Sequence, residues 1–144
     1  MRFLIDTCVV SEWKRRSPDP AVLAWLETLA QDDLVFRILT IGEPRQGILR
    51  LPPGKRRDEL HAWLQELRDL YAPRIVPVSD REIDAWADIN AAVEAKGASV
   101  AAIDGLLAAT AGAHGLAVAT RNVSDFLPTG VPVFDPWSGA WHNR

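Results

Sequence analysis

Short apolar segments alternate with helical segments along this chain, and that alternation restricts the fold more than any other feature. The patterns predict strands at residues 2–5, 34–41, 74–78, 116–120 and 131–134. They predict helices at about 20–31, 56–71, 79–96 and 100–114, and a short one that ends at Arg50. Strands that alternate with helices form a parallel sheet covered on both faces. The expected fold is therefore α/β, with ligands bound beyond the carboxyl ends of the strands.

The length and composition suit one globular domain that spans residues 1–144. No apolar run approaches the roughly 20 residues that span a bilayer. The N-terminal segment is too short and too soon acidic for a secretory signal. Cys8 is the only cysteine, which excludes an internal disulfide and a zinc cluster built on thiolates. We therefore expect a cytoplasmic protein that does not bind membranes.

Charge is distributed unevenly along the chain. The net charge of the chain is −3. Residues 1–57 contain ten basic and seven acidic residues, which gives +3, and residues 58–144 contain six basic and twelve acidic residues, which gives −6. The basic residues gather as Lys14-Arg15-Arg16 and Lys55-Arg56-Arg57, with Arg45 and Arg50 between them. Any one of these clusters is most simply a solvated surface. Together they allow a local phosphate-binding face on an acidic protein.

Four carboxylates occupy positions that a parallel sheet can bring together. Asp6 ends the first strand, Glu43 lies just past the second, and Asp125 follows the strand at 116–120. Asp104 interrupts an apolar helix. A buried carboxylate is costly unless it is paired, hydrogen-bonded or bound to metal, and close carboxylates repel one another. A hard divalent cation removes this conflict, and oxygen ligands fit Mg²⁺ or Mn²⁺.

An acidic metal site of this kind supports phosphodiester hydrolysis. The metal orients the phosphate, lowers the pKa of a bound water and stabilises the developing charge. The three histidines, His61, His114 and His142, show no zinc-ligand spacing. No glycine-rich loop follows a predicted strand, which argues against a P-loop or Rossmann phosphate site.

Each of these acidic residues also has a purely structural explanation. Asp6 can cap a turn after a strand, and Thr40–Glu43 has the spacing of a capping box. Pro44 argues against that capping box and favours a helix that starts at Pro44 itself. Asp104 can bond a neighbouring backbone group, and Asp125 can be a turn residue or an N-cap. The coincidence of all four positions favours a functional site.

Four segments of the sequence resemble the PIN-domain family, specifically the VapC/FitB-type toxins of bacterial toxin–antitoxin pairs. They are "FLIDTCVVSEW", "LTIGEPRQGI", "AIDGLLAATAGAHGLAVATRNVSDF" and "GVPVFDPW". The segments follow the family's order, and the resemblance extends over nearly the whole chain. The resemblance implies a three-layer α/β/α fold with a central parallel sheet of four or five strands. It also implies a Mg²⁺- or Mn²⁺-dependent endoribonuclease that is the toxin of a type II toxin–antitoxin pair.

The resemblance assigns roles to particular residues and implies partners. It makes Asp6 and Asp104 the main metal ligands, with Glu43 and Asp125 as the other catalytic acids. Supporting roles fall to three polar residues, Thr7, Thr120 and Asn122. The implied partners are an RNA substrate, a second copy of the chain, and a cognate antitoxin that inserts a peptide across the site. Homodimers would assemble with antitoxin into heterotetramers or larger complexes.

The sequence departs from the family pattern at three positions. Cys8 stands where Asn is usual, and Pro44 follows the second acid, where an aliphatic residue is usual. Arg37 lies inside the second predicted strand, where it can reach the end of the sheet, pair with an acid or mark a sheet edge. These changes leave an alternative open, a catalytically impaired PIN-fold module that mainly binds its antitoxin or RNA.

The tryptophans allow two interpretations. Trp137 and Trp141 lie in the C-terminal tail, where they can stack on RNA bases or pack the tail onto the body. We expect packing, because buried aromatic residues usually serve cores and interfaces. The tryptophan-bearing helices can similarly form an antitoxin groove or contribute to the core.

Overall fold

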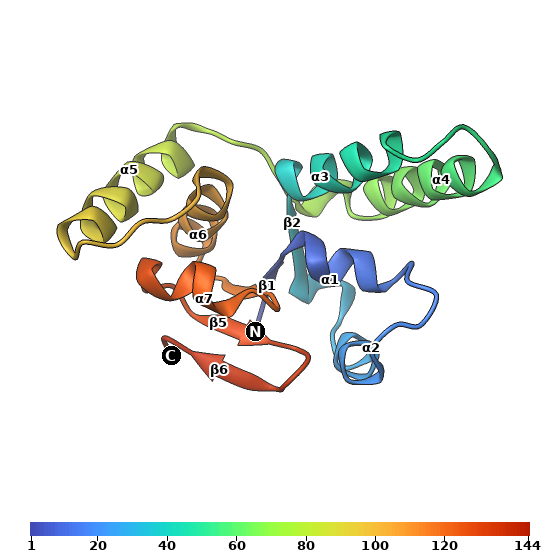
Figure 1. Cartoon of the computed structure of the whole chain (residues 1–144). Coiled ribbons are helices and arrows are strands. Elements are labelled where there is room, and N and C mark those ends of the chain that lie inside the picture. Colours follow the sequence, from blue (N-terminus) through green and yellow to red (C-terminus); the bar gives the residue numbers. More distant parts are fainter.

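The computed structural model describes all 144 residues and has three layers (Figure 1). The sheet consists of β1 (Phe3–Ile5), β2 (Leu34–Arg37), β3 (Ile75–Val76), β4 (Ala117–Ala119), β5 (Val133–Asp135) and β6 (Ala140–His142). Its strand order is β3-β2-β1-β4-β5-β6, and all neighbours are parallel except β5 and β6. The expected α/β fold with a central parallel sheet is confirmed, and a sixth, antiparallel strand extends it.

Seven helices surround this sheet. They are α1 (Thr7–Glu12), α2 (Pro20–Glu27), α3 (Ile38–Leu49), α4 (Lys55–Leu70), α5 (Asp80–Ala95), α6 (Ala102–His114) and α7 (Val123–Phe126). Helices α3 and α4 lie together on one side of the molecule, and α5 and α6 lie together on the other (Figure 1). The expected capping box starts α5, where the backbone N–H of Ser79 donates to Glu82 at 3.0 Å. None of these helices combines the length and apolar character needed to cross a membrane.

Successive residues of each strand face two different cores. Phe3 and Ile5 of β1 belong to a core shared with α1, α2, α3 and α4. Leu4, between them, belongs to a second core shared with α6 and α7. This alternation is the ordinary consequence of a pleated strand. Each fully buried aliphatic side chain stabilises the fold by about 1.5–3 kcal/mol, so both faces of the short strands hold the sheet in place.

The second strand is shorter than the sequence predicts. The prediction over 34–41 is wrong beyond Arg37, because α3 begins at the next residue. Branched apolar runs fit a buried strand and a buried helix equally well. Thr40 and Glu43 therefore lie within α3 and form no capping box at its start. Pro44 lies inside α3 and does not begin it, so it has no N–H to donate to the carbonyl of Thr40.

Arg37 ends β2 and is completely buried. Its three guanidinium nitrogens make no hydrogen bond. Burial lowers the pKa of Arg37, and the nearby charge of Glu82 opposes this effect. Because β2 lies between β1 and β3, Arg37 does not mark a sheet edge, and it forms no ion pair with an acid.

The C-terminal tail packs onto the body, as expected. The Trp141 ring centroid in β6 lies 5.0 Å from that of Phe134 and 5.8 Å from that of Phe3. Trp137 packs against the same core, and the guanidinium of Arg121 lies 5.4 Å from its ring centroid. The aromatic pairs fix β6 along the edge of β5.

Candidate functional site

The carboxyl ends of β1 and β4 meet in the middle of the sheet. The chain continues from β1 to β2 on one side and from β4 to β5 on the other. Connections that leave in opposite directions open a crevice beyond the strand ends, where α/β proteins bind ligands. Asp6 and Thr120 are the first residues after these two strands, and the Asp6 backbone N–H donates to the carbonyl of Ala119 at 3.1 Å. The fold therefore delivers both side chains to the crevice.

The carboxylate of Asp6 is held by three donors. The backbone N–H of Thr7 donates to its Oδ1 at 2.8 Å, and the hydroxyl of Thr120 donates to its Oδ2 at 2.7 Å. The thiol of Cys8 donates to the same Oδ2 at 3.5 Å. Thr120 is itself fixed, because it is fully buried and its hydroxyl oxygen accepts from the backbone N–H of Asn122 at 3.0 Å. Asp6 thus caps α1, as the structural explanation held, and it also presents an oriented carboxylate.

Cys8 belongs to this network, a role that the sequence did not reveal. Its sulfur lies 3.5 Å from the hydroxyl of Thr120 and accepts the backbone N–H of Arg121 at 3.5 Å. Burial and, to a lesser extent, the negative charge of Asp6 raise the pKa of the Cys8 thiol to about 11. The thiol is therefore protonated at neutral pH and serves as a weak donor.

Asp104 lies in the first turn of α6, half-buried and without a hydrogen bond. Burial has the largest effect on its pKa, and together with the charges of Asp6, Asp125 and Glu43, in that order, it raises this pKa to about 6. Like charges act on a pKa in this way only at short range. The structure thus brings the four acids that the sequence singled out into one neighbourhood. Their catalytic roles stay a prediction.

Glu43 and Asp125 stand at the rim of this neighbourhood. Burial raises the pKa of Glu43, and the charge of Asp6 also raises it. The nearby hydroxyl of Thr7 lowers the pKa of Glu43 by more than Asp6 raises it, although this hydroxyl is buried and reaches no partner in hydrogen-bond geometry. Asp125 is exposed on α7, and Asn122 is exposed just before that helix. Asn122 supports the site through its backbone, whereas its side chain makes no hydrogen bond.

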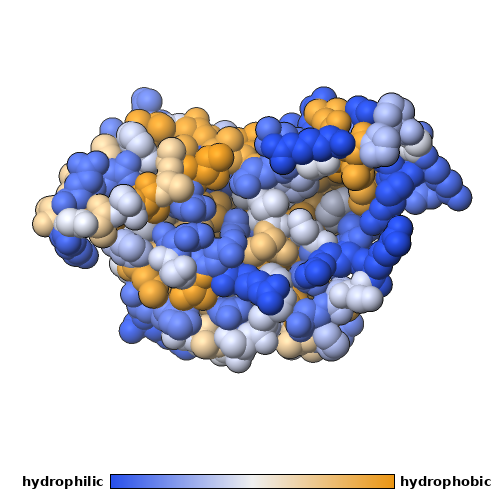
Figure 2. Space-filling view, viewed as in Figure 1, coloured by the Kyte–Doolittle hydropathy of each residue, from blue (hydrophilic) through white to orange (hydrophobic).

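A groove of about 330 Å³ opens from Thr7 and Glu43 between α1, α3 and α4. Lys14, Arg56 and Trp63 also line it. The Lys14 ammonium lies 5.8 Å from the Trp63 ring centroid, and the guanidinium of Arg56 donates to the carbonyl of Lys14 at 3.1 Å. Figure 2 shows apolar surface in the depth on the α3–α4 side and hydrophilic side chains around it. The acidic site is thus bordered by a groove with cationic and apolar walls.

The residues of the acidic neighbourhood fit a hard divalent cation. Their donors are carboxylate oxygens, and the raised pKa of Asp104 reflects a repulsion that a cation would relieve. No group of three or more histidine, cysteine, aspartate or glutamate side chains is arranged so that it could hold a metal ion. Mg²⁺ usually keeps several waters and takes only one or two protein carboxylates, which matches Asp6 and Asp104.

Comparison with known proteins identifies a family. The PIN domain family matches residues 3–126. Toxin FitB of Neisseria gonorrhoeae is 39% identical over 135 residues, covering 93% of this chain and 97% of that protein. The VapC ribonuclease Y4jK of Sinorhizobium fredii is 36% identical over 138 residues, covering 95% and 99%.

Solved structures agree with these sequence matches. The crystal structure of FitAcB from Neisseria gonorrhoeae contains a chain that is 38% identical and superposes with a TM-score of 0.90, covering 94% of this chain and 98% of that one. A member of the VapBC family of toxin–antitoxin systems from Mycobacterium tuberculosis superposes with a TM-score of 0.63 at 25% identity, covering 87% of each chain. Fold, strand-end chemistry and sequence agree, and the chain belongs to the PIN-domain family, with FitB and VapC toxins among its relatives.

Proposed function

We propose that this protein is the toxin of a type II toxin–antitoxin pair and acts as a Mg²⁺- or Mn²⁺-dependent endoribonuclease. The observation that carries the proposal is the pKa of Asp104, which is raised by burial and by three acids from separate elements of the fold. Such concentrated negative charge suits a divalent cation. A toxin and a ribonuclease among the relatives support the same class of activity.

Asp6 and Asp104 would hold the metal, which when bound polarises a phosphate and lowers the pKa of a coordinated water. The groups that donate hydrogen bonds to Asp6 fix the orientation of its carboxylate. Hydrogen-bond partners of a metal-binding side chain typically increase its affinity for the metal. The raised pKa of Glu43 makes its carboxylate a stronger base than a free one, so Glu43 can accept a proton from the attacking water. Asp125 would add a further negative charge that helps to hold the cation at the site.

The groove beside Glu43 offers a path for the RNA. Lys14 and Arg56 place positive charge along it, where they can contact phosphates next to the cleaved bond. Trp63 contributes an aromatic face to the same groove, on which a base can stack. Substrate binding therefore relies on local charge, because the net charge of the chain is negative.

The same groove is suited to an antitoxin segment. Its apolar residues, including Leu60 and Trp63, can receive a hydrophobic peptide, and a basic side chain of that peptide would neutralise the acidic site. Two toxin chains would form a homodimer, and antitoxin would join them in a heterotetramer or larger assembly. Relatives from toxin–antitoxin systems support this arrangement. Co-expression with a reading frame immediately upstream should restore growth and yield a co-purifying complex.

The direct test is Asp104→Asn, which removes the charge at nearly constant volume. We expect the variant to lose RNA cleavage while its circular dichroism spectrum stays native. Asp88→Asn, on the exposed face of α5, is the matched control and should cleave like the wild type. Cleavage by Asp104→Asn at the wild-type rate would remove Asp104 from the mechanism.

Titration of Mn²⁺ into the metal-free protein distinguishes the enzyme from the impaired binding module. The enzyme should take up Mn²⁺ at the acidic cluster, and Asp6→Asn should weaken that uptake. No uptake by the wild type would favour the module. In cells, brief induction should stop growth and create new RNA ends, and continued growth without new ends would argue against a toxin.

A further inference from the structure

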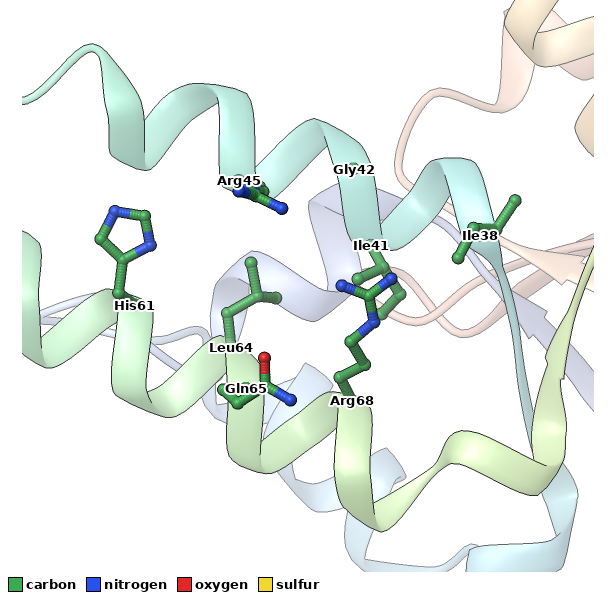
Figure 3. Close-up of a pocket in the computed structure, with 8 residues that line it drawn as sticks. All are labelled: Ile38, Ile41, Gly42, Arg45, His61, Leu64, Gln65 and Arg68. Carbon is green, nitrogen blue, oxygen red and sulfur yellow. The ribbon is translucent and has the colours of Figure 1, made fainter.

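Helices α3 and α4 enclose a second cavity, of about 350 Å³, that none of the acidic residues lines (Figure 3). Ile38, Ile41 and Leu64 form its apolar part. The other lining residues are Gly42 and four polar side chains, Arg45, His61, Gln65 and Arg68. The cavity is therefore distinct from the groove beside Glu43.

Glu43 and Arg45 both belong to α3, but their side chains line two different sites. They are two residues apart, and because a helix turns about 100° per residue, their side chains leave α3 on nearly opposite faces. Glu43 lines the groove next to the acidic neighbourhood, whereas Arg45 lines the second cavity. One rigid helix thus connects both sites.

The second cavity contains positive charge that nothing in the chain neutralises. Arg45 and Arg68 form no ion pair and no side-chain hydrogen bond, and no acidic residue lines the cavity. Figure 3 shows Arg45, His61 and Arg68 turned toward the space between the two helices. The side-chain N–H groups of Gln65 donate to Asp69 at 2.9 Å, and Asp69 itself stays outside the lining. Two unpaired guanidinium groups in one cavity repel each other and leave their donors free for an anion.

We propose that this cavity binds a backbone phosphate of the RNA substrate, away from the bond that is cleaved. Guanidinium groups match phosphate oxygens in shape and can form two hydrogen bonds at once. The inference rests on the proposed ribonuclease function. It adds a contact that holds the RNA along α3 while the acidic site acts on another phosphate.

RNA is a better occupant than an antitoxin segment on grounds of charge. A peptide that neutralises the acidic cluster must be basic there, and further basic residues would be repelled by Arg45 and Arg68. RNA, as a polyanion, can bind at both sites. The acidic site accepts a phosphate when it holds a cation, and the second cavity accepts a phosphate directly. An acidic stretch of the antitoxin is the competing occupant, and the experiment separates the two.

The test compares two double variants that each remove two positive charges. Arg45→Gln with Arg68→Gln alters the cavity. Arg81→Gln with Lys96→Gln is the matched control, because both residues are exposed at α5, outside the basic clusters, and neither lines a cavity. Both are made in the Asp104→Asn background and mixed with a labelled single-stranded oligoribonucleotide in EDTA, so that the RNA stays intact. Fluorescence anisotropy gives the Kd as a function of salt.

We expect the cavity variant to bind RNA about tenfold more weakly at low salt than the control variant. Its slope of log Kd against log salt should fall by about 0.7, because one phosphate contact on a single strand contributes about that much. Arg45→Lys with Arg68→Lys keeps the charge and should retain most of the affinity. Native circular dichroism of all variants excludes misfolding as the cause.

Three results would overturn the inference. Equal affinities and slopes for the cavity and control variants, with tight binding by the parent, would refute the phosphate site and leave the ribonuclease proposal intact. Normal RNA binding with loss of antitoxin capture would assign the cavity to the antitoxin. Absence of RNA binding by the Asp104→Asn parent in EDTA would remove the inference, whereas absence of RNA cleavage by the wild type with Mg²⁺ or Mn²⁺ would remove the function on which it rests.

Discussion

The hydroxyl of Thr120 donates a 2.7 Å hydrogen bond to Oδ2 of Asp6, across 114 positions of the chain. This bond joins the carboxyl ends of β4 and β1, and it forms without any bound ion. One ligand of the proposed metal is therefore oriented by the fold itself. The remaining acids approach Asp6 from helices, where burial and the charges of the other acids raise the pKa of Asp104 to about 6.

Thr120→Val should weaken Mn²⁺ binding and RNA cleavage by roughly 10- to 100-fold, the usual effect of removing an outer partner of a metal ligand. The volume hardly changes, but Asp6 loses its shortest side-chain donor. Isothermal titration calorimetry and a cleavage assay measure the two effects. Thr110→Val is the control, because Thr110 is equally buried and bonds only the carbonyl of Leu106. Equal losses in both variants would show a general packing effect.

Metal-free Asp104 should titrate near pH 6 in an NMR experiment, and Asp6→Asn should lower that pKa because it removes the like charge with the largest effect on it. A raised pKa means that the folded state binds the proton more tightly than the unfolded state, so stability falls as pH rises toward neutrality. Asp104→Asn should thus increase the free energy of unfolding at pH 7 without metal, by on the order of 1 kcal/mol after solvent screening. An unshifted pKa would show that the four acids are not close.

Glu82 should make the protein sensitive to acid. The hydroxyl and backbone N–H of Ser79 and the ring of His114, at 2.6 Å, hold the pKa of Glu82 at about 2, and Ser79 has the largest effect. A lowered pKa contributes stability above about pH 4.5 that is lost as pH falls toward 2. Glu82→Gln should therefore unfold more easily at pH 7 and show a flatter stability profile between pH 4.5 and 2. Urea titrations measure this, with exposed Glu94→Gln unchanged. A wild-type profile in Glu82→Gln would contradict the assignment.

Arg37→Met should stabilise the protein by about 1–4 kcal/mol, because a buried charge without a partner is costlier than an apolar side chain of similar size. Arg37→Lys keeps a charge at the same place and should bring no gain. Urea unfolding with circular dichroism compares the variants. A lower free energy of unfolding for Arg37→Met would contradict the description of Arg37 as unpaired.

The strand ends that carry Asp6 and Thr120 could be predicted from the sequence, because each follows a short apolar run bounded by polar residues. The helix around Asp104 and the capping box at Ser79 were equally readable, since both depend on local patterns. What local patterns cannot show is which distant elements touch. The hydrogen bond that Thr120 donates to Asp6 is an example, because it arises only when β1 and β4 pair.

The region from β2 to α3 shows where sequence patterns are ambiguous. Its apolar run contains β-branched residues that suit a strand, yet packing against α4 makes the segment after Arg37 helical. Glu43 consequently reaches the acidic neighbourhood from a helix and not from a strand end. Strand β6 was also missed, because it is three residues long and depends on tertiary pairing with β5.

Crystallisation with Mn²⁺, with anomalous scattering recorded at the manganese edge, tests the central claim most directly. We expect one anomalous peak in contact with carboxylate oxygens of both Asp6 and Asp104, and no such peak in Asp104→Asn crystals grown under the same conditions. A wild-type crystal in which these two carboxylates point apart, with no anomalous density between them, would refute the proposed metal site.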